Sequence, residues 1–186
     1  VVQCGSGLGE LAGMLKSGGK SVPMDEIPHF PVASVTGHGR EAVYGRIGKA
    51  GVLVLTGRIH IYEGHDPLTA GFPAAVAKAA GARLLVITNA AGGLNQHYRE
   101  GDLMVHRDFI NFQHDNAIAH LQADTAVERY VDPKPPYHVK SSELLAQALV
   151  RSQLDVHYGV YIGVQGPIFE TRAELAMMRS FGADAI

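Results

Sequence analysis

Apolar, β-branched stretches alternate with helix-like stretches along the chain, and this alternation predicts an α/β fold built around a sheet. Most of the predicted strands are dense in Val, Ile and Leu, as expected of strands that other elements cover on both faces. The predicted strands are Val32–Thr36, Ala42–Ile47, Val52–Thr56, Leu84–Asn89, Leu103–His106 and Val156–Val164. The predicted helices are Leu8–Lys16, Leu68–Ala80, Ser142–Ser152 and Arg172–Ser180.

The start of the last helix is the best defined boundary in the sequence. Thr171 and Glu174 have the spacing of a capping box, in which each side chain satisfies a backbone amide of the first turn. The periodic pattern is lost between residues 112 and 140, where the proline-rich stretch 132–136 predicts a loop.

The two ends of the chain look like parts of strands. Val1–Cys4 has the pattern of a strand that is ending, and Phe181–Ile186 has the pattern of one that is beginning. A length of 186 residues suits one domain. We therefore expect a single domain over residues 1–186 that is incomplete at both ends.

Composition and charge narrow the function further. The net charge of −2 argues against binding to nucleic acid or to an acidic membrane. No run approaches the roughly 18 apolar residues of a membrane-spanning helix. Charged residues make up 18% of the chain, below the roughly 25% of an average protein, which favours an oligomer. The single cysteine, Cys4, excludes an internal disulfide and fits a reducing compartment, so we expect a cytoplasmic protein.

The stretch Cys4–Gly9 is a glycine-rich turn between a predicted strand and a predicted helix. Glycines allow backbone amides to point at an anion, a helix N-terminus adds its dipole, and Ser6 adds a hydroxyl donor. A dinucleotide fingerprint does not fit, because Glu10 stands where the third glycine belongs, and the spacing of an esterase elbow is also absent. A phosphate-binding loop is the favoured interpretation, and a tight turn without a ligand is the alternative.

A second stretch, Gly57–Gly64, alternates polar and apolar side chains. In an extended chain Arg58, His60 and Tyr62 share one face. They follow an apolar strand, and open α/β sheets bind ligands near strand ends. Arg and His suit a phosphate and Tyr suits a sugar hydroxyl; a solvent-exposed edge strand is the alternative.

Two other glycine-rich stretches indicate a ligand less specifically. The stretch Thr36–Arg40 places His38 between two glycines, which suits either a residue that closes over an anion or an exposed loop histidine. The stretch Thr88–Asn95 is rich in small residues, which leave room either for a ligand against the backbone or for close packing of strand and helix.

The stretch Gly166–Thr171 precedes the capped helix and offers groups for a planar ring. Phe169 presents a flat face, and Glu170 can accept hydrogen bonds from ring N–H groups. The alternatives are a core position for Phe169 and a helix-dipole role for Glu170. No metal site is predicted, because the histidines lack Cys or carboxylate partners at ligand spacing.

Taken together, these stretches resemble the trimeric, low-molecular-mass purine nucleoside phosphorylases, in the family's order and over nearly the whole chain. The resemblance rests on Gly5–Gly9, Gly57–Gly64, Thr88–Asn95, Gly101–Met104 with Asp108–Asn111, and Gly166–Thr171. It implies an α/β, phosphorylase/hydrolase-like three-layer fold, with a mixed, partly barrel-like central sheet flanked by helices, and a homotrimer. The implied reaction converts a purine nucleoside and phosphate to the free base and α-D-ribose 1-phosphate, with phosphate as co-substrate and no cofactor.

The resemblance also implies a role for each site residue. The phosphate-binding set is Ser6, Arg58, His60 and Ala90, with His38 closing over the anion. Tyr62 binds ribose, and the base-binding set is Phe169, Glu170, Ala91 and Gly92. His60, Glu170 and His38 are the implied catalytic residues. A phosphate pressed against the anomeric carbon stabilises the cationic sugar and attacks it, so catalysis is mainly positioning and electrostatics.

The sequence departs from the family pattern in three places. The family's Asn-Pro-Leu and Phe-Pro-Asp-Met-Ser stretches are not recognisable after Asn111, and Tyr137 is the candidate for the aromatic residue that reaches a neighbour's ribose site. Ile168 and Arg172 replace a Ser and a Pro of the family. The family's Met-Ser pair, its base-binding Asn and its His near the 5′ position are expected after Ile186.

Glu170 favours 6-oxopurine nucleosides, inosine and guanosine, because a carboxylate accepts from a ring N–H that adenine lacks. The alternatives are a methylthioadenosine phosphorylase, which accepts a 6-aminopurine, and a catalytically inactive purine-binding homologue. The expected partners are therefore a purine nucleoside and phosphate, without nucleic acid or membrane.

Overall fold

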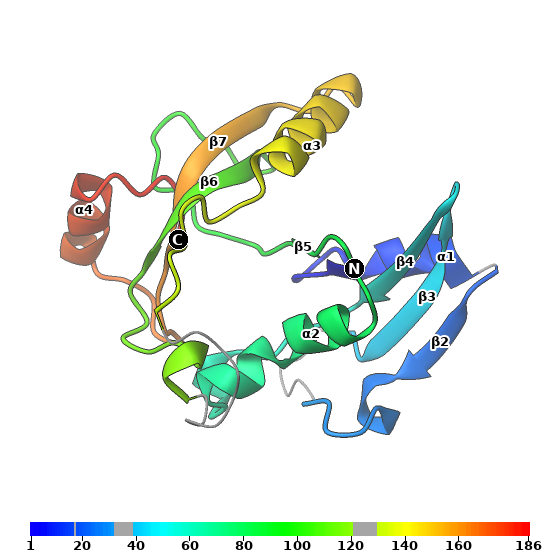
Figure 1. Cartoon of the computed structure of the whole chain (residues 1–186). Helices are drawn as coiled ribbons and strands as arrows, with labels where there is room; N and C mark the ends of the chain where they lie inside the picture. The colour runs from blue at the N-terminus through cyan, green and yellow to red at the C-terminus, as the bar shows by residue number, and fades with distance from the viewer. Residues whose placement is uncertain (17, 32–38, 121–129) are drawn as a thin grey trace. The chain divides into compact units, whose positions relative to one another are not determined.

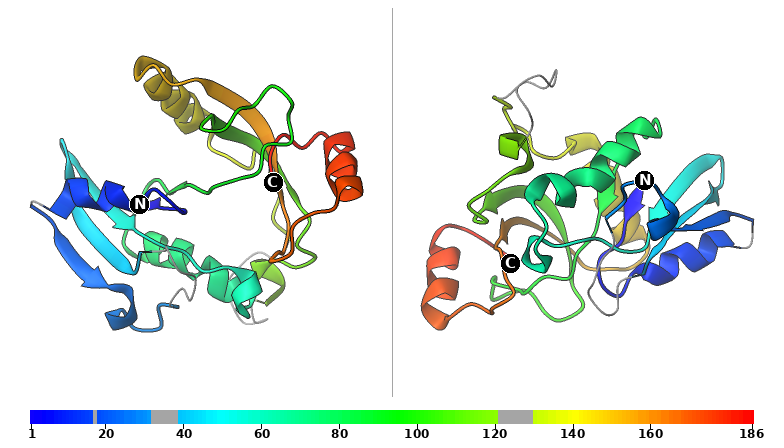
Figure 2. Two further views of the ribbon diagram at one scale, coloured as in Figure 1. Left: turned by 180° about the vertical axis from the view of Figure 1, so that it is seen from behind. Right: turned by 90° about the horizontal axis from the view of Figure 1, so that it is seen from below.

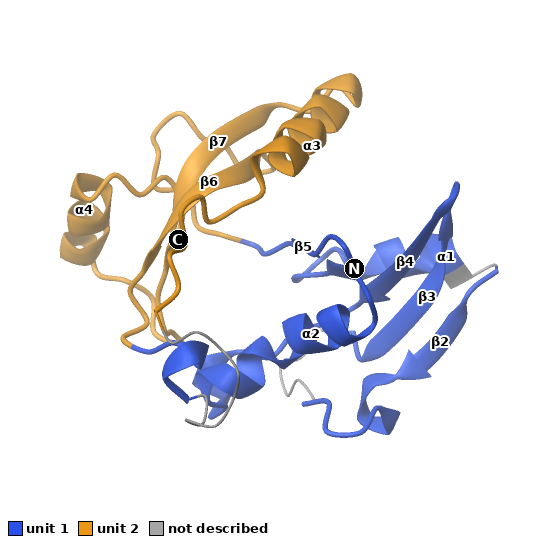
Figure 3. Cartoon of the chain, viewed as in Figure 1, with its two compact units in different colours: residues 1–90, 115–125 blue, residues 91–114, 126–186 orange. Residues whose placement is uncertain are grey.

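The computed structural model describes residues 1–16, 18–31, 39–120 and 130–186 (Figure 1). The predicted strand Val32–Thr36 and the candidate His38 lie outside the described residues. The chain divides into two compact units, unit 1 with residues 1–90 and 115–125 and unit 2 with residues 91–114 and 126–186 (Figure 3). The single domain stays a prediction.

Unit 1 contains a mixed five-stranded sheet in the order β2-β3-β4-β1-β5. Its strands are β1 (Val2–Gln3), β2 (Lys20–Pro23), β3 (Glu41–Ile47), β4 (Ala50–Leu55) and β5 (Val86–Ile87). Strand β1 is parallel to both β4 and β5, whereas β2, β3 and β4 pair in antiparallel fashion. The mixed sheet that the resemblance implied is confirmed.

Helices cover both faces of this sheet. Val43 pairs with Val54, and the next pair along the strands is Ala42 with Leu55. Because successive strand residues point to opposite faces, the two pairs face opposite ways. The first pair packs with Leu15 in one core cluster, and the second packs against residues of α2 in another. This arrangement of helix, sheet and helix is the expected three-layer architecture, and Figure 2 shows it from two further sides.

The first predicted helix is replaced by two shorter elements, the 3₁₀ helix η1 (Gly9–Ala12) and α1 (Gly13–Lys16). Each begins at a glycine, whose conformational freedom disfavours a continuous helix. Helix α2 (Pro67–Ala79) begins one residue earlier than predicted. Its N-cap Asp66 accepts a hydrogen bond from the Thr69 amide at 2.8 Å, and proline suits the first helical position. The other 3₁₀ helices are η2 (Met24–Glu26), η3 (Ile61–Glu63) and η4 (Ala117–His120).

Strand β2 was not predicted, and its position explains why. It lies at the edge of the sheet, all four of its residues are exposed, and it ends in a proline. Such a strand buries no apolar face, so it has no hydrophobic pattern to recognise.

Unit 2 is built on two parallel strands, β6 (Leu103–Asn111) and β7 (Val156–Gly163). Strand β6 runs beyond its predicted end at His106, because a register shift between His106 and Asp108 accommodates one extra residue and the pairing then continues. Helix α3 (Val139–Arg151) contacts both strands, and α4 (Arg172–Ser180) packs on a core that contains Ile162.

Unit 2 also contains the predicted capping box and the segment predicted to be the last strand of the chain. The capping box is confirmed, because Thr171 accepts from the Glu174 amide and Glu174 accepts from the Thr171 amide. The end of the chain makes single bridges rather than a strand, in which Ala185 meets Gly93 and Tyr161.

The partly barrel-like closure is not found. Within the described residues the strands form one sheet of five and one of two, and neither closes on itself. None of the helices seen there is both long and apolar enough to cross a membrane.

Candidate functional site

The glycine-rich loop after β1 is held close to the end of β5. The Gly5 amide donates to the Thr88 hydroxyl at 2.9 Å. A Cβ on Gly5 would lie 2.6 Å from the Thr88 carbonyl oxygen and 2.7 Å from the Asn89 Cα, so only glycine fits here. Gly7 has a φ of 85°, which also favours glycine. These constraints leave Ser6 exposed at the tip of the loop.

Arg58, His60 and Tyr62 gather as their spacing predicted. Arg58 Nε donates to His60 Nε2 at 3.3 Å, and the rings of His60 and Tyr62 stack with centroids 4.7 Å apart. The backbone is not extended throughout, because His60 is extended but Tyr62 lies on η3. The Arg58 guanidinium also donates from Nη1 to the Thr88 carbonyl at 3.3 Å. Thr88 therefore connects this cluster to the glycine-rich loop.

Glu63 is a site residue that the sequence analysis missed. Its Oε1 accepts from the His60 amide at 2.8 Å and lies 2.8 Å from His60 Nδ1. The Glu63 side chain is only 3% exposed and that of His60 is 17% exposed. A carboxylate only accepts, so Nδ1 carries a ring proton, and Nε2 is the acceptor of the Arg58 Nε–H. His60 and Glu63 do have the three-residue spacing of a capping box, which could have indicated this contact. Histidine, however, is not among the preferred N-cap residues, so the spacing was not recognised.

For the phosphorolysis that the family resemblance implies, we expect Glu63→Gln to raise the KM for phosphate about fivefold, or about 1 kcal/mol, because an amide is a weaker partner for His60 than a carboxylate. Glu174→Gln is the matched control, since it changes the equivalent glutamate of the other capping box in unit 2. Steady-state kinetics with phosphate as the varied substrate measures both. An equal rise in the phosphate KM of the two variants would assign Glu63 to folding alone.

The stretch Thr88–Asn95 passes from unit 1 into unit 2. Ala90 is exposed at the end of unit 1, and Ala91 is exposed at the start of unit 2. The Gly92 amide donates to the Ile186 carbonyl at 2.8 Å, and the Ile186 amide donates back at 2.9 Å. Gly92 therefore serves backbone packing within unit 2, and its contact with a base stays a prediction.

Phe169 and Glu170 lie between β7 and α4 in unit 2. Phe169 is 92% exposed, so its alternative interpretation as a core residue is wrong. Glu170 is half-buried and precedes the N-cap Thr171, whereas Glu174 makes the capping contacts. Phe169 and Glu170 are thus available for a ligand, and their roles toward a base stay predictions.

Tyr137 packs against an aromatic group of its own unit. Its hydroxyl lies 3.2 Å from His106 Nδ1, and the His106 ring stacks on Tyr161 with centroids 5.0 Å apart. Burial raises the pKa of Tyr137, with the charge of Asp108 adding to the effect, and burial lowers the pKa of His106. Both shifts favour the neutral forms of Tyr137 and His106.

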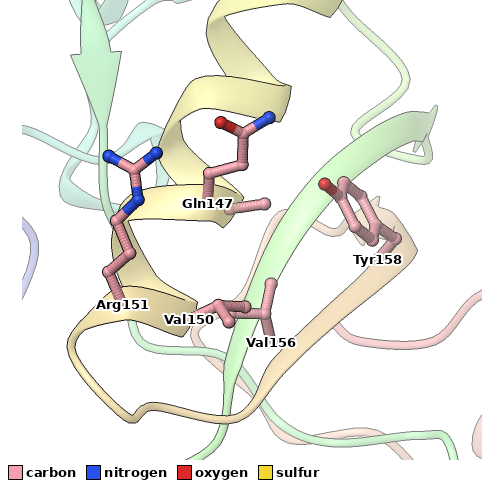
Figure 4. A pocket seen from close by; sticks show the side chains of 6 residues that line it. Gln147, Val150, Arg151, Val156 and Tyr158 are labelled. Carbon is pink, nitrogen blue, oxygen red and sulfur yellow. The ribbon is translucent and has the colours of Figure 1, made fainter.

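A pocket of about 450 Å³ lies within unit 2. It is formed by α3 and β7, with Val150, Val156 and Tyr158 as its apolar walls and Gln147 and Arg151 as polar groups (Figure 4). None of the candidate site residues lines it. In the described part of the chain, no three His, Cys, Asp or Glu side chains gather in a way that could hold a metal ion.

Comparisons with known proteins give the family. A model of the phosphorylase superfamily matches residues 1–186. Purine nucleoside phosphorylase 1 of Geobacillus stearothermophilus is 39% identical over 182 residues, which cover 98% of this chain and 66% of that protein. The structure of Schistosoma mansoni purine nucleoside phosphorylase in complex with inosine has a TM-score of 0.89 at 32% identity, over 99% of this chain and 66% of that one. A purine nucleoside phosphorylase in complex with ribose-1-phosphate has a TM-score of 0.90 at 33% identity, over 99% of this chain and 69% of that one.

The chain thus spans slightly less than two thirds of the length of the Geobacillus protein that it matches. The match to the family model nevertheless extends over every residue of the chain. The fold, the sequence identity and the order of the motifs agree, and the chain therefore belongs to the phosphorylase superfamily and, within it, to the purine nucleoside phosphorylases.

Proposed function

We propose that the protein is a purine nucleoside phosphorylase that cleaves 6-oxopurine nucleosides. Inosine or guanosine and phosphate would give the free base and α-D-ribose 1-phosphate, without a cofactor. The observation that carries the proposal is the group of Arg58, His60 and Tyr62, joined through Thr88 to the loop of Ser6, in a member of this family.

In the proposed site, phosphate binds to groups of unit 1. Arg58 and the Ser6 hydroxyl donate to its charged oxygens, together with the Ala90 amide. His60 carries its proton on Nδ1, so Nε2 is its one acceptor. As phosphate binds, the Arg58 Nε–H that donates to Nε2 turns to a charged phosphate oxygen, and Nε2 accepts the P–OH hydrogen of a monohydrogen phosphate instead. Glu63 holds that tautomer in place. The anion is thereby oriented with a charged oxygen available for attack.

Cleavage then needs no side-chain nucleophile. As the bond between the sugar and the base stretches, positive charge develops on the sugar, and the adjacent phosphate stabilises it and forms the new C–O bond. The base leaves with the electron pair of the broken bond and takes up a proton, and the new phosphate ester gives up its P–OH proton, so that the base is released neutral. Tyr62 supports the ribose, and Phe169, Glu170, Ala91 and Gly92 are proposed to hold the base. His38 is proposed to close over the phosphate.

The test is incubation of the protein with inosine in the presence and absence of inorganic phosphate, followed by identification of the products. We expect hypoxanthine and an equal amount of ribose 1-phosphate, formed only with phosphate present. Free ribose formed without phosphate would indicate a hydrolase. Equal turnover of adenosine would favour a 6-aminopurine enzyme. Nucleoside binding without turnover would identify an inactive purine-binding homologue.

We also propose that the protein works as a homotrimer in the cytoplasm. The low fraction of charged residues supports association, as do exposed apolar side chains such as Tyr44, Ile47 and Val150. The buried free thiol of Cys4, whose pKa is raised by burial, suits a reducing compartment. Light scattering at micromolar concentration should give the mass of three chains, and a monomer would contradict the trimer.

A further inference from the structure

Thr88 makes polar contacts with both halves of the proposed phosphate site through two different groups. Its hydroxyl accepts from the Gly5 amide at 2.9 Å, at the start of the glycine-rich loop. Its carbonyl accepts from Arg58 Nη1 at 3.3 Å. We propose that Thr88 is a positioning residue, which sets the loop of Ser6 and the Arg58 guanidinium at the spacing that a phosphate needs. This inference rests on the proposed function.

The backbone of Thr88 is itself fixed by the sheet. Its amide donates to the Gln3 carbonyl at 3.0 Å, which continues the parallel pairing of β1 with β5. Gly5 lies two residues farther along, beyond the end of β1, where the strand pairing has ended. Here the Thr88 hydroxyl replaces a backbone partner of the sheet: it accepts from the Gly5 amide and donates to the Gln3 carbonyl at 3.4 Å. The Thr88 side chain thus fixes the first glycine of the glycine-rich loop, Gly5, to the end of strand β5.

The loop is tightly coupled to Thr88 in space as well. Gly5 is buried, and a Cβ there would lie 2.6 Å from the Thr88 carbonyl oxygen. The carbonyl that meets Gly5 is the same one that accepts from Arg58. A displacement of the loop against Thr88 therefore changes the relative position of Ser6 and Arg58, and phosphate binding depends on both.

The hydroxyl and the carbonyl can be separated by mutation. Thr88→Val keeps the shape and the carbonyl but removes the hydroxyl, so the Gly5 amide loses its acceptor. Thr88→Ala also removes the hydroxyl and serves if valine prevents folding. Thr88→Ser keeps the hydroxyl. Thr69→Val is the matched control, because it removes a threonine hydroxyl that donates to Asp66 at the N-cap of α2 in the same unit.

The experiment measures binding of inorganic phosphate by calorimetry and the phosphate KM in inosine phosphorolysis, for the wild type and the four variants. We expect Thr88→Val and Thr88→Ala to weaken phosphate binding and raise its KM about fivefold to tenfold, with the KM for inosine changed less than twofold. Thr88→Ser and Thr69→Val should stay within twofold of the wild type in both measurements.

Each outcome decides between the inference and the function on which it rests. Wild-type turnover with an unchanged phosphate KM in Thr88→Val and Thr88→Ala would overturn the role of Thr88 alone. An effect of Thr88→Ser as large as that of Thr88→Val would also overturn it, since packing of the methyl group would then be responsible. A wild type that binds phosphate but turns over no nucleoside would contradict the proposed function, and the binding data would still judge Thr88. A wild type without phosphate binding would overturn both.

Discussion

Replacement of Arg58 by alanine is expected to raise the KM for phosphate by roughly tenfold to a hundredfold and to leave the KM for inosine nearly unchanged. The guanidinium is held toward the site by two contacts, one with His60 Nε2 and one with the Thr88 carbonyl. Hydrogen bonds to charged groups contribute about 1.5–3 kcal/mol, and alanine removes both the donors and the positive charge. The measurement is steady-state kinetics with each substrate varied in turn.

Arg46→Ala is the matched control for this change. Arg46 lies on β3 in the same unit, and its guanidinium donates to the Lys49 carbonyl on the exposed side of the molecule. Arg46→Ala removes one positive charge, as Arg58→Ala does, but Arg46 is not one of the proposed site residues. Equal phosphate KM values for the Arg58→Ala and Arg46→Ala variants would place Arg58 outside the phosphate site.

Glu170→Gln is expected to lower kcat/KM for inosine at least tenfold, or about 1.4 kcal/mol, with little change in phosphate affinity. In the proposed base site, the carboxylate of Glu170 would accept from the ring N–H of a 6-oxopurine and from the exocyclic amine of guanine. Glutamine keeps the shape but replaces one acceptor oxygen with a donor. A site built to hydrogen-bond a polar group discriminates strongly, because a mismatch leaves buried groups unpaired. The same change should narrow the difference between inosine and adenosine.

The measurement is kcat/KM for both nucleosides with the wild type and the variant. Glu143→Gln is a suitable control, since Glu143 is an exposed glutamate on α3 of the same unit. If inosine turnover by Glu170→Gln matched that of the control, Glu170 would only complement the dipole of α4, and the proposed base site would be wrong.

The sequence predicted the elements that bury an apolar face or carry a clear cap. The strands that became β4 and β7 were rich in Val, Ile and Leu, β3 buries Ala42 and Val43, and α4 was bounded by its capping box. The exposed edge strand β2 lacks such a pattern. The first predicted helix is broken at Gly13, a local feature that the hydrophobic period does not report. The bulge in β6 depends on tertiary packing, which periodicity also does not report.

The candidate site was predictable where side-chain spacing alone brings groups together. Arg58, His60 and Tyr62 are two residues apart and do meet. Glu63 was missed because its role depends on a 3₁₀ turn that aims its carboxylate back at His60. Thr88 was missed because its partners, Gly5 and Arg58, are 83 and 30 residues away in the chain. Such long-range contacts leave no local pattern in one sequence.

A crystal structure of the protein grown in phosphate tests the proposed phosphate site directly. We expect density for a phosphate in unit 1, within hydrogen-bond distance of the Arg58 guanidinium and the Ser6 hydroxyl. His60 Nε2 should then contact the anion, while Nδ1 keeps its contact with Glu63. Density for phosphate only elsewhere, such as beside Arg151 in the pocket of α3 and β7, with the Arg58 cluster unchanged, would contradict it.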